Sequence, residues 1–312
     1  MSGAMATGDL PAPPPRVAVV LGLLSVYLIW GSTYLGIRLG LRGFPPFLMA
    51  GIRFLFAGSV LLLWLRWRGH ALPTRRQWQN AAIMGCLLLG LGNGLVSVAQ
   101  QWVSSGMAAI SVASMPVWAA LFGVAFGRRY LSVEWLGVGI GFVGVLILNI
   151  GGELRAQPLG ALCLLAAPAG WAFGSVWSRG RDLPAPFMST AAQMLCGGAV
   201  MGSFGLAIGE RIDSVPSPLA LGAVVYLAVF GSIIGFGAYI WLLHNVRPAL
   251  ATSYAYVNPP IAVLLGAIVA NEQVGWQTLI AMAVILTGVV LITRGSRPHP
   301  PSAAKPQLKG AD

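Results

Sequence analysis

Tyr254 and Asn258 stand four residues apart in an apolar stretch, directly before Pro259. Residues four apart lie on one face of a helix, so the hydroxyl and the amide point the same way. Proline lacks a backbone N–H and loosens the helix around it. At an offset of 143 residues, Ser111 stands in the same relation to Pro116. We expect the two prolines to be helix hinges and the polar side chains to line a path for a small solute.

Other polar and aromatic side chains fall on helix faces that match between the two halves of the chain. They are Asn93 and Gln100, Tyr239, Trp30 with Tyr34, and Trp171 with Ser175. Together they predict a pathway rich in aromatic rings, hydroxyls and amides and nearly without fixed charge. The alternative for each Trp and Tyr is packing between helices or anchoring at a membrane interface.

Arg53 is the one cation well inside an apolar stretch, seven residues beyond Pro46 and therefore roughly 10 Å along a helix. Such an arginine needs a partner or a wet cavity. It could bind a substrate carboxylate as a two-pronged fork, or satisfy carbonyls at a broken helix end, and we favour the structural role. His244 is a possible proton site, although a packed or interfacial histidine is favoured. Glu134 and Glu272 fall at the ends of stretches, where we expect solvated loop charges.

The composition determines which elements carry these residues. Hydrophobic residues make up 57% of the 312 and charged residues only 9%, whereas soluble domains carry about 25% charged residues. Ten apolar stretches are long enough, or nearly so, to cross a bilayer as helices. They are 17–37, 46–65, 78–99, 107–127, 133–150, 158–178, 187–208, 218–243, 250–270 and 275–293. The predicted fold is therefore an all-α integral membrane protein with ten transmembrane helices.

The ten stretches form two inverted repeats of five helices. Segments 100–146 and 243–290 align at the offset of 143, and Arg128-Arg129 in the first copy corresponds to Asn271-Glu272 in the second. Because each half has an odd number of helices, the second half enters the membrane in the inverted orientation. This explains why corresponding loops of the two halves carry charges of opposite sign. The predicted organisation is a disordered segment 1–16, repeats 17–151 and 152–293, and a disordered cytoplasmic tail 294–312.

Loop charges predict the orientation and exclude other classes of protein. With both termini in the cytoplasm, fourteen Lys and Arg residues fall on the cytoplasmic side and four on the other. The net charge of +11 is then spread over loops, so no nucleic acid partner is expected. No Ser–His pair with protease spacing, no paired intramembrane aspartates and no His–carboxylate cluster occurs, so we expect no enzyme, no metal and no cofactor. Cys86, Cys163 and Cys196 are expected to pack in apolar surroundings.

A set of short motifs runs through the apolar stretches: Ile29-Trp30-Gly31-Ser32, Pro45-Pro46 leading to Arg53, Pro116 through Gly144, and Asn258-Pro259 through Gly288. In these motifs the chain resembles the EamA family of the drug/metabolite transporter superfamily, and the resemblance covers about residues 17–293. Asn258-Pro259 and Asn271-Glu272 stand where the second repeat of this family often has Glu-Pro and Gly-Glu. The resemblance implies ten helices and transport, and within the family the chain looks like bacterial exporters of neutral and aromatic amino acids.

We therefore expect an alternating-access carrier in a bacterial inner membrane that exports small metabolites, most plausibly neutral or aromatic amino acids. The alternative is a proton-coupled exporter of hydrophobic drugs or other metabolites, and a membrane-embedded enzyme is a remote one. Because every Asp and Glu maps to a loop, a terminus or a helix end, we expect facilitated diffusion. The expected partners are the lipid bilayer and a small-molecule substrate. Gly137-x-x-x-Gly141 and Gly198-x-x-x-Gly202 could pack internally or form a homodimer, so monomer and homodimer both remain open.

Overall fold

Proline stands at the start of several helices. In the computed structural model, which describes residues 15–150, 157–246 and 248–295, a proline occupies the first turn of α2, α6, α9, α10 and α11. The missing N–H is harmless there and the fixed φ angle suits a helix start. All regular elements of the described residues are helical. They are α1 (Arg16–Gly40), α2 (Pro46–Trp67), α3 (Arg75–Met84), η1 (Gly85–Gly94), α4 (Leu95–Ala99), α5 (Ser105–Val112), α6 (Met115–Ala125), α7 (Ser132–Ile150), α9 (Pro158–Trp177), α10 (Pro186–Ala207), α11 (Pro218–Tyr226), η2 (Leu227–Ile234), α12 (Gly235–Asn245), α13 (Pro248–Ala251), α14 (Tyr254–Ala270) and α15 (Trp276–Gly295).

Length and apolarity make this an integral membrane protein. Seven helical stretches of the described residues are long and apolar enough to cross a bilayer. They are Arg16–Gly40, Pro46–Trp67, Arg75–Ala99, Ser105–Ala125, Pro158–Trp177, Pro218–Asn245 and Trp276–Arg294. Ser132–Leu148 and Tyr254–Ala270 are apolar but shorter, and α10 includes glycine, serine and glutamine among its apolar residues. The prediction of ten crossings stays a prediction for these three helices.

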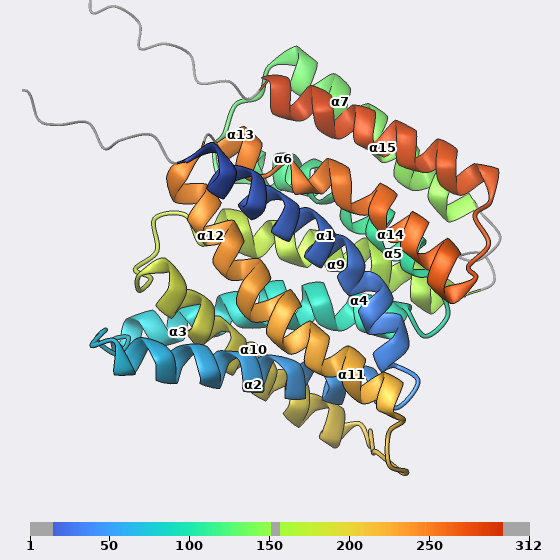
Figure 1. The fold of residues 1–312 in the computed structure, drawn as a ribbon. Coiled ribbons are helices and arrows are strands. Elements are labelled where there is room, and N and C mark those ends of the chain that lie inside the picture. The colour runs from blue at the N-terminus through green and yellow to red at the C-terminus, as the bar shows by residue number, and fades with distance from the viewer. Residues whose placement is uncertain (1–14, 151–156, 247, 296–312) are drawn as a thin grey trace, which may run out of the picture.

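Two helix pairs flank a central group (Figure 1). The pair α7 and α15 lies at one end of the molecule and α2 with α10 at the other, while α1, α9, α12 and α14 run between them. Glycines hold both pairs close together. A Cβ at Gly288 would lie 2.5 Å from the backbone nitrogen of Gly141, and a Cβ at Gly51 would lie 3.1 Å from the carbonyl oxygen of Gly198. The predicted small-residue motifs therefore take part in packing within the chain.

Two of the long stretches contain wide, π-helical turns at corresponding positions. The stretch from α3 to α4 includes η1, and the stretch from α11 to α12 includes η2. Wide turns of this kind often mark functional sites, because they shift side chains out of the regular helical register. They occur in helices that the sequence analysis expected to be regular.

The predicted hinges lie close to helix interruptions. Pro116 is in the first turn of α6, just after the break between α5 and α6. Pro259 lies inside α14, after the turn at residues 252 and 253 that separates α13 from α14. Of the two segments predicted to be disordered, residues 1–14 and 296–312 lie outside the described residues, while α1 begins at Arg16 and α15 continues to Gly295.

Candidate functional site

Helices of the central group and their neighbours line a cavity. The space between its walls is about 890 Å³, including the part that is open to solvent. Its walls come from α1, α2, η1, α4, α5, α6, α9, η2, α12 and α14. The predicted residues that line it are Trp30, Tyr34, Arg53, Asn93, Pro116, Trp171, Tyr254, Asn258 and Pro259. The packing of these helices thus brings most of the predicted side chains to the same cavity.

Trp30 is the centre of an aromatic cluster on one wall of the cavity. Its indole nitrogen donates a hydrogen bond to the carbonyl oxygen of Gly231 in η2, at 3.1 Å. Its ring centroid lies 5.1 Å from Phe236, 5.2 Å from Tyr239 and 4.9 Å from Tyr254. The near-perpendicular arrangement with Tyr254 is favourable for aromatic pairs. This network joins α1, α12 and α14 at the cavity.

The two cavity tryptophans pack against glycines in equivalent positions. A Cβ at Gly235 would lie 2.5 Å from the indole nitrogen of Trp30, and a Cβ at Gly92 would lie 2.8 Å from Cε3 of Trp171. Trp30 and Trp171 are matched by the repeat, and so are Gly92 and Gly235 at the offset of 143. Each tryptophan therefore lies against a side-chain-free position, one at the end of η1 and the other at the start of α12.

Arg53 is buried, with 5% of its surface exposed, and it lines the cavity. Its Nε donates a hydrogen bond to Ser232 Oγ at 2.9 Å, and its guanidinium carbon lies 4.6 Å from the centroid of the Phe54 ring. No carboxylate of the described residues forms an ion pair with it. Arg53 therefore brings a positive charge to a wall that is otherwise apolar, aromatic or neutral.

Two buried amides contain oxygens that lack a hydrogen-bond partner among the described residues, Asn258 Oδ1 and Gln100 Oε1. Asn258 lines the cavity. Gln100 is fully buried outside the lining, where its Nε2 donates to the carbonyl oxygen of Tyr34 at 2.9 Å. An unpartnered buried oxygen is costly, and only that of Asn258 belongs to a side chain that lines the cavity.

Five predicted residues lie outside the lining. Gln100 and Ser111 are buried in the packing. Ser175 Oγ donates to the carbonyl oxygen of Trp171, a local helix bond. Tyr239 supports the cluster from behind, 5.5 Å from Tyr254 between ring centroids. His244 is exposed near the end of α12, with Nδ1 2.8 Å from the carbonyl oxygen of Ile240.

Several lining residues were missed by the sequence analysis. Thr33, Pro168 and Phe236 all face the cavity. Thr33 stands three residues after Trp30, and Pro168 stands three residues before Trp171, so each shares a helix face with a tryptophan that was predicted. A proline inside an apolar helix was itself an available signal. Phe236 follows the π-helical turn η2, whose shift of register cannot be read from the spacing.

The prediction that Glu134 and Glu272 are solvated loop charges is wrong. Glu272 is partly buried, and its carboxylate accepts hydrogen bonds from the backbone nitrogen and hydroxyl of Ser105, at the start of α5. Glu134 is 3% exposed. Glu210 similarly accepts bonds from the backbone nitrogens of Phe47 and Leu48 in α2, at 3.1 and 2.8 Å. The unpaired N–H groups and the dipole of a helix start favour such anions.

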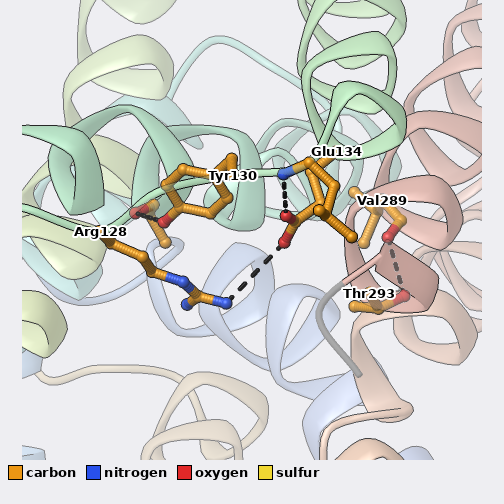
Figure 2. A network of polar contacts seen from close by, with 7 residues as sticks. Arg128, Tyr130, Glu134, Val289 and Thr293 are labelled. Atoms are coloured by element: carbon orange, nitrogen blue, oxygen red, sulfur yellow. Dashed lines mark hydrogen bonds and ion pairs between the residues drawn. The ribbon is translucent and has the colours of Figure 1, made fainter. Parts of the chain in front are cut away.

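Figure 2 shows the surroundings of Glu134. Its carboxylate lies 3.9 Å from Arg128 and accepts a bond from the backbone nitrogen of Leu131 at 2.6 Å. Burial raises the pKa of Tyr130, whose hydroxyl bonds the carbonyl oxygen of Ala119, and the nearby charge of Arg128 opposes that rise. The charges after α6 are therefore part of a structured turn, away from the cavity lining.

The cavity offers contacts to a small solute and shows no metal-binding arrangement. Among the described residues, no group of three His, Cys, Asp or Glu side chains is placed to hold a metal ion. The lining combines aromatic rings, amides and one guanidinium. Such a site can bind an organic molecule through stacking and directed hydrogen bonds.

The chain is similar to known membrane transporters. The EamA-like transporter family matches the chain in two stretches, residues 17–150 and 158–294. The uncharacterized inner membrane transporter YedA of Escherichia coli K12 is 47% identical over 285 residues, which cover 91% of this chain and 92% of YedA. The uncharacterized transporter YoaV of Bacillus subtilis is 27% identical over 288 residues, or 89% of this chain and 97% of YoaV. A crystal structure with 21% identity shares the fold with a TM-score of 0.63 and covers 90% of this chain and 99% of its own.

Proposed function

Because this chain belongs to the EamA-like transporter family, we propose that it is an alternating-access carrier for small metabolites, most plausibly neutral or aromatic amino acids. The observation that carries this proposal is the central cavity, lined by Trp30, Tyr254, Asn258 and Arg53 and built from helices of both halves of the chain. A site between two repeats is where carriers of this architecture bind their substrates.

An inverted repeat of five plus five helices is supported by three matched features. The first is the pair of π-helical turns, η1 and η2. The second is the packing of Trp171 on Gly92 and of Trp30 on Gly235. The third is the match of the family to one stretch in each half. Together they favour ten crossings, and the excess of Lys and Arg in one set of loops favours both termini in the cytoplasm.

The lining favours a molecule with apolar or aromatic bulk and no net positive charge. Within the described part of the chain, the lining includes Arg53 but no Asp or Glu. A hydrophobic cation would lack a counter-charge there and would lie near a guanidinium. Hydrophobic drugs without a charge remain the second candidate, because aromatic walls suit them equally.

Facilitated diffusion is the mode of transport that we propose. Proton-driven carriers commonly use a titratable group in the membrane. The acidic side chains near helix ends, Glu134, Glu210 and Glu272, are outside the cavity lining, and His244 is exposed on α12. A zwitterion can then move down its own gradient, and export is the direction expected from the resemblance to amino-acid exporters.

Counterflow in proteoliposomes tests this proposal. Vesicles loaded with one unlabelled amino acid should take up the labelled form of that amino acid transiently, for at least one of a panel of neutral and aromatic amino acids. Vesicles without protein are the control. Absence of counterflow for the whole panel, together with uptake of a neutral drug, would replace amino acids by drugs as the substrate class. We propose a bacterial inner membrane as the location, because the relative YedA is named an inner membrane transporter.

A further inference from the structure

The guanidinium of Arg53 has a fixed orientation and a free edge. Nε donates to Ser232 Oγ at 2.9 Å, and the hydroxyl of Ser232 donates to the carbonyl oxygen of Leu227 at 3.1 Å. Because the serine hydroxyl has a single proton, which it gives to Leu227, its oxygen accepts from the arginine. Ser232 therefore uses the Nε edge, and the two terminal nitrogens of Arg53 keep four N–H groups for other partners.

Those terminal nitrogens have no protein acceptor among the described residues. Nε to Ser232 is the one hydrogen bond of the side chain there, and the described residues offer no carboxylate within ion-pair distance. Neither nitrogen is fully buried, so both border open space. The open space that Arg53 lines is the cavity. A Cβ at Gly231 would lie 3.1 Å from one of these two nitrogens. Because Gly231 has no side chain, the edge of the guanidinium that carries them is not obstructed there.

A buried cation in a membrane protein needs compensation. Without a counter-ion, an intramembrane arginine is expensive unless water or a ligand solvates it. The parallel N–H groups of the terminal nitrogens match the two oxygens of a carboxylate. A structural role at a broken helix end would instead direct these nitrogens at free carbonyl oxygens, and the described residues provide no such bond.

Asn258 provides the complementary group elsewhere in the same cavity. Its Oδ1 has no donor among the described residues and is fully covered in this state, so it can accept from a ligand N–H only after the amide turns toward the cavity that the side chain lines. Trp30 connects the two groups: its indole nitrogen bonds Gly231, beside Arg53, and its ring packs on Tyr254, one turn before Asn258. The apolar surface of Trp30 thus lies between the N–H donors of Arg53 and the acceptor oxygen of Asn258.

We propose that Arg53 binds the carboxylate of the transported molecule through its two terminal nitrogens and that Asn258 turns its Oδ1 toward the cavity to accept a hydrogen bond from the amino group of that molecule. This assignment rests on the proposed transport of amino acids and specifies what is recognised: one carboxylate, one amine and an apolar side chain against Trp30. A dicarboxylate would leave its second charge unpaired, since Arg53 is the one charged residue that the described part of the chain brings to the lining. An amine without a carboxylate would leave the fork empty.

Three related probes separate these contacts. They are L-phenylalanine, L-phenylalaninamide, which lacks the carboxylate, and 3-phenylpropionate, which lacks the amine. Binding to the purified full-length protein is measured by quenching of tryptophan fluorescence. We expect L-phenylalanine to bind at least about tenfold more tightly than its amide, because the amide cannot form the charged two-pronged bond. In Arg53→Gln that ratio should fall below about twofold.

Asn258→Ala should lose the preference for L-phenylalanine over 3-phenylpropionate and keep the preference over the amide. Arg53→Lys keeps the positive charge but lacks the paired terminal N–H groups, so the ratio of affinities for L-phenylalanine and its amide should be intermediate. This variant replaces Arg53→Gln in the test if Arg53→Gln does not fold. Arg66→Gln is the matched control on the same helix, since Arg66 is exposed and bonds only the carbonyl oxygen of His70 among the described residues. Its ratios should equal those of the wild type.

The failures of the two proposals are distinguishable. Counterflow in the wild type with an unchanged carboxylate-to-amide ratio in a folded Arg53→Gln overturns the assignment of Arg53 and leaves the transport function standing. If L-phenylalanine does not bind, the same comparison is made with alanine, leucine and valine and their amides. If no carboxylate in these four pairs binds more tightly than its amide, the assignment is overturned, whereas absence of counterflow for all amino acids overturns the proposed function.

Discussion

The carboxylate of Glu272, which follows α14, holds the first residue of α5, Ser105. Both carboxylate oxygens lie 3.0 Å from the backbone nitrogen of Ser105, and its hydroxyl donates to Oε2 at 2.8 Å. Asn271, just before the glutamate, adopts a left-handed conformation with φ of 53°, which turns the chain out of α14 and directs the carboxylate to α5. One glutamate thus joins the end of a helix in the second half to the start of a helix in the first half.

Glu272→Gln should lower the free energy of unfolding by about 1–3 kcal/mol, because hydrogen bonds to charged groups are stronger than those to neutral ones. The midpoint of thermal unfolding in detergent measures the loss. Asp213→Asn is the control, since Asp213 is an exposed acidic residue in the segment between α10 and α11. Equal midpoints for Glu272→Gln and the wild type would show that the carboxylate adds nothing beyond a neutral acceptor.

Gly235→Ala should reduce transport several-fold, because its Cβ would lie 2.5 Å from the indole nitrogen of Trp30 and would displace that ring from Gly231. Gly222→Ala is the matched control in α11, the same membrane stretch, where a Cβ meets nothing within 4 Å. There alanine should stabilise the helix by about 0.5–1 kcal/mol. Initial rates of counterflow and unfolding midpoints are compared, and equal rates in the two variants would contradict the role of Trp30.

Asn258→Ala should impair transport without loss of stability. Its Oδ1 has no protein donor among the described residues, so its removal leaves no partner unsatisfied, and the change in unfolding free energy should stay within about 0.5 kcal/mol. Tyr254→Ala should impair transport as well, and it should also lower stability, because it removes ring contacts with Trp30 and Tyr239. Normal kinetics in both variants would show that this face of α14 only packs.

The inverted repeat predicts the side on which each loop is accessible. In a chain with Cys86, Cys163 and Cys196 replaced by serine, Arg75→Cys should be protected from an impermeant thiol reagent in intact cells. Asp213→Cys should react with it. Both positions are exposed in the structure, so the membrane alone decides the result. Labelling of Arg75→Cys would exclude the proposed orientation.

Facilitated diffusion predicts that substrate accumulates in proteoliposomes only to equilibrium. An imposed pH gradient should change the initial rate by less than about twofold, because the described lining holds no acidic residue and His244 is exposed. Concentrative uptake driven by that gradient would contradict the prediction. Its disappearance in His244→Ala would identify this histidine as the proton carrier.

Spacing along helices put Trp30, Tyr254 and Asn258 on faces expected to line a path, and all three side chains line the cavity, because four-residue periodicity survives in regular helices. It gave no prediction for Phe236, and Tyr239, which was expected on the path, lies outside the lining; both residues follow the π-helical turn η2. The wide turn rotates all later side chains, so Phe236 lines the cavity and Tyr239 supports it from behind.

The environment of single charges was even less accessible from sequence. The carboxylate of Glu272 looked like an ordinary loop charge, since its acceptor role depends on Ser105, 167 positions earlier in the chain. Arg53 was visible as a buried cation, but nothing in the sequence revealed that Ser232 would use one edge of the guanidinium and leave the other free. Contacts between distant helices decide such details.

The seam between α7 and α15 has a consequence for the interpretation of mutational scans. A Cβ at Gly288 would meet the backbone of both Gly137 and Gly141, at 2.6 and 2.5 Å, and backbone atoms cannot rotate aside as a side chain can. These glycines should therefore tolerate no replacement, even though none of them lines the cavity. A position that accepts no substitution in this protein therefore need not contact the transported molecule. A mutational scan alone would assign these three glycines a direct role in transport, whereas their role is the close packing of α7 against α15.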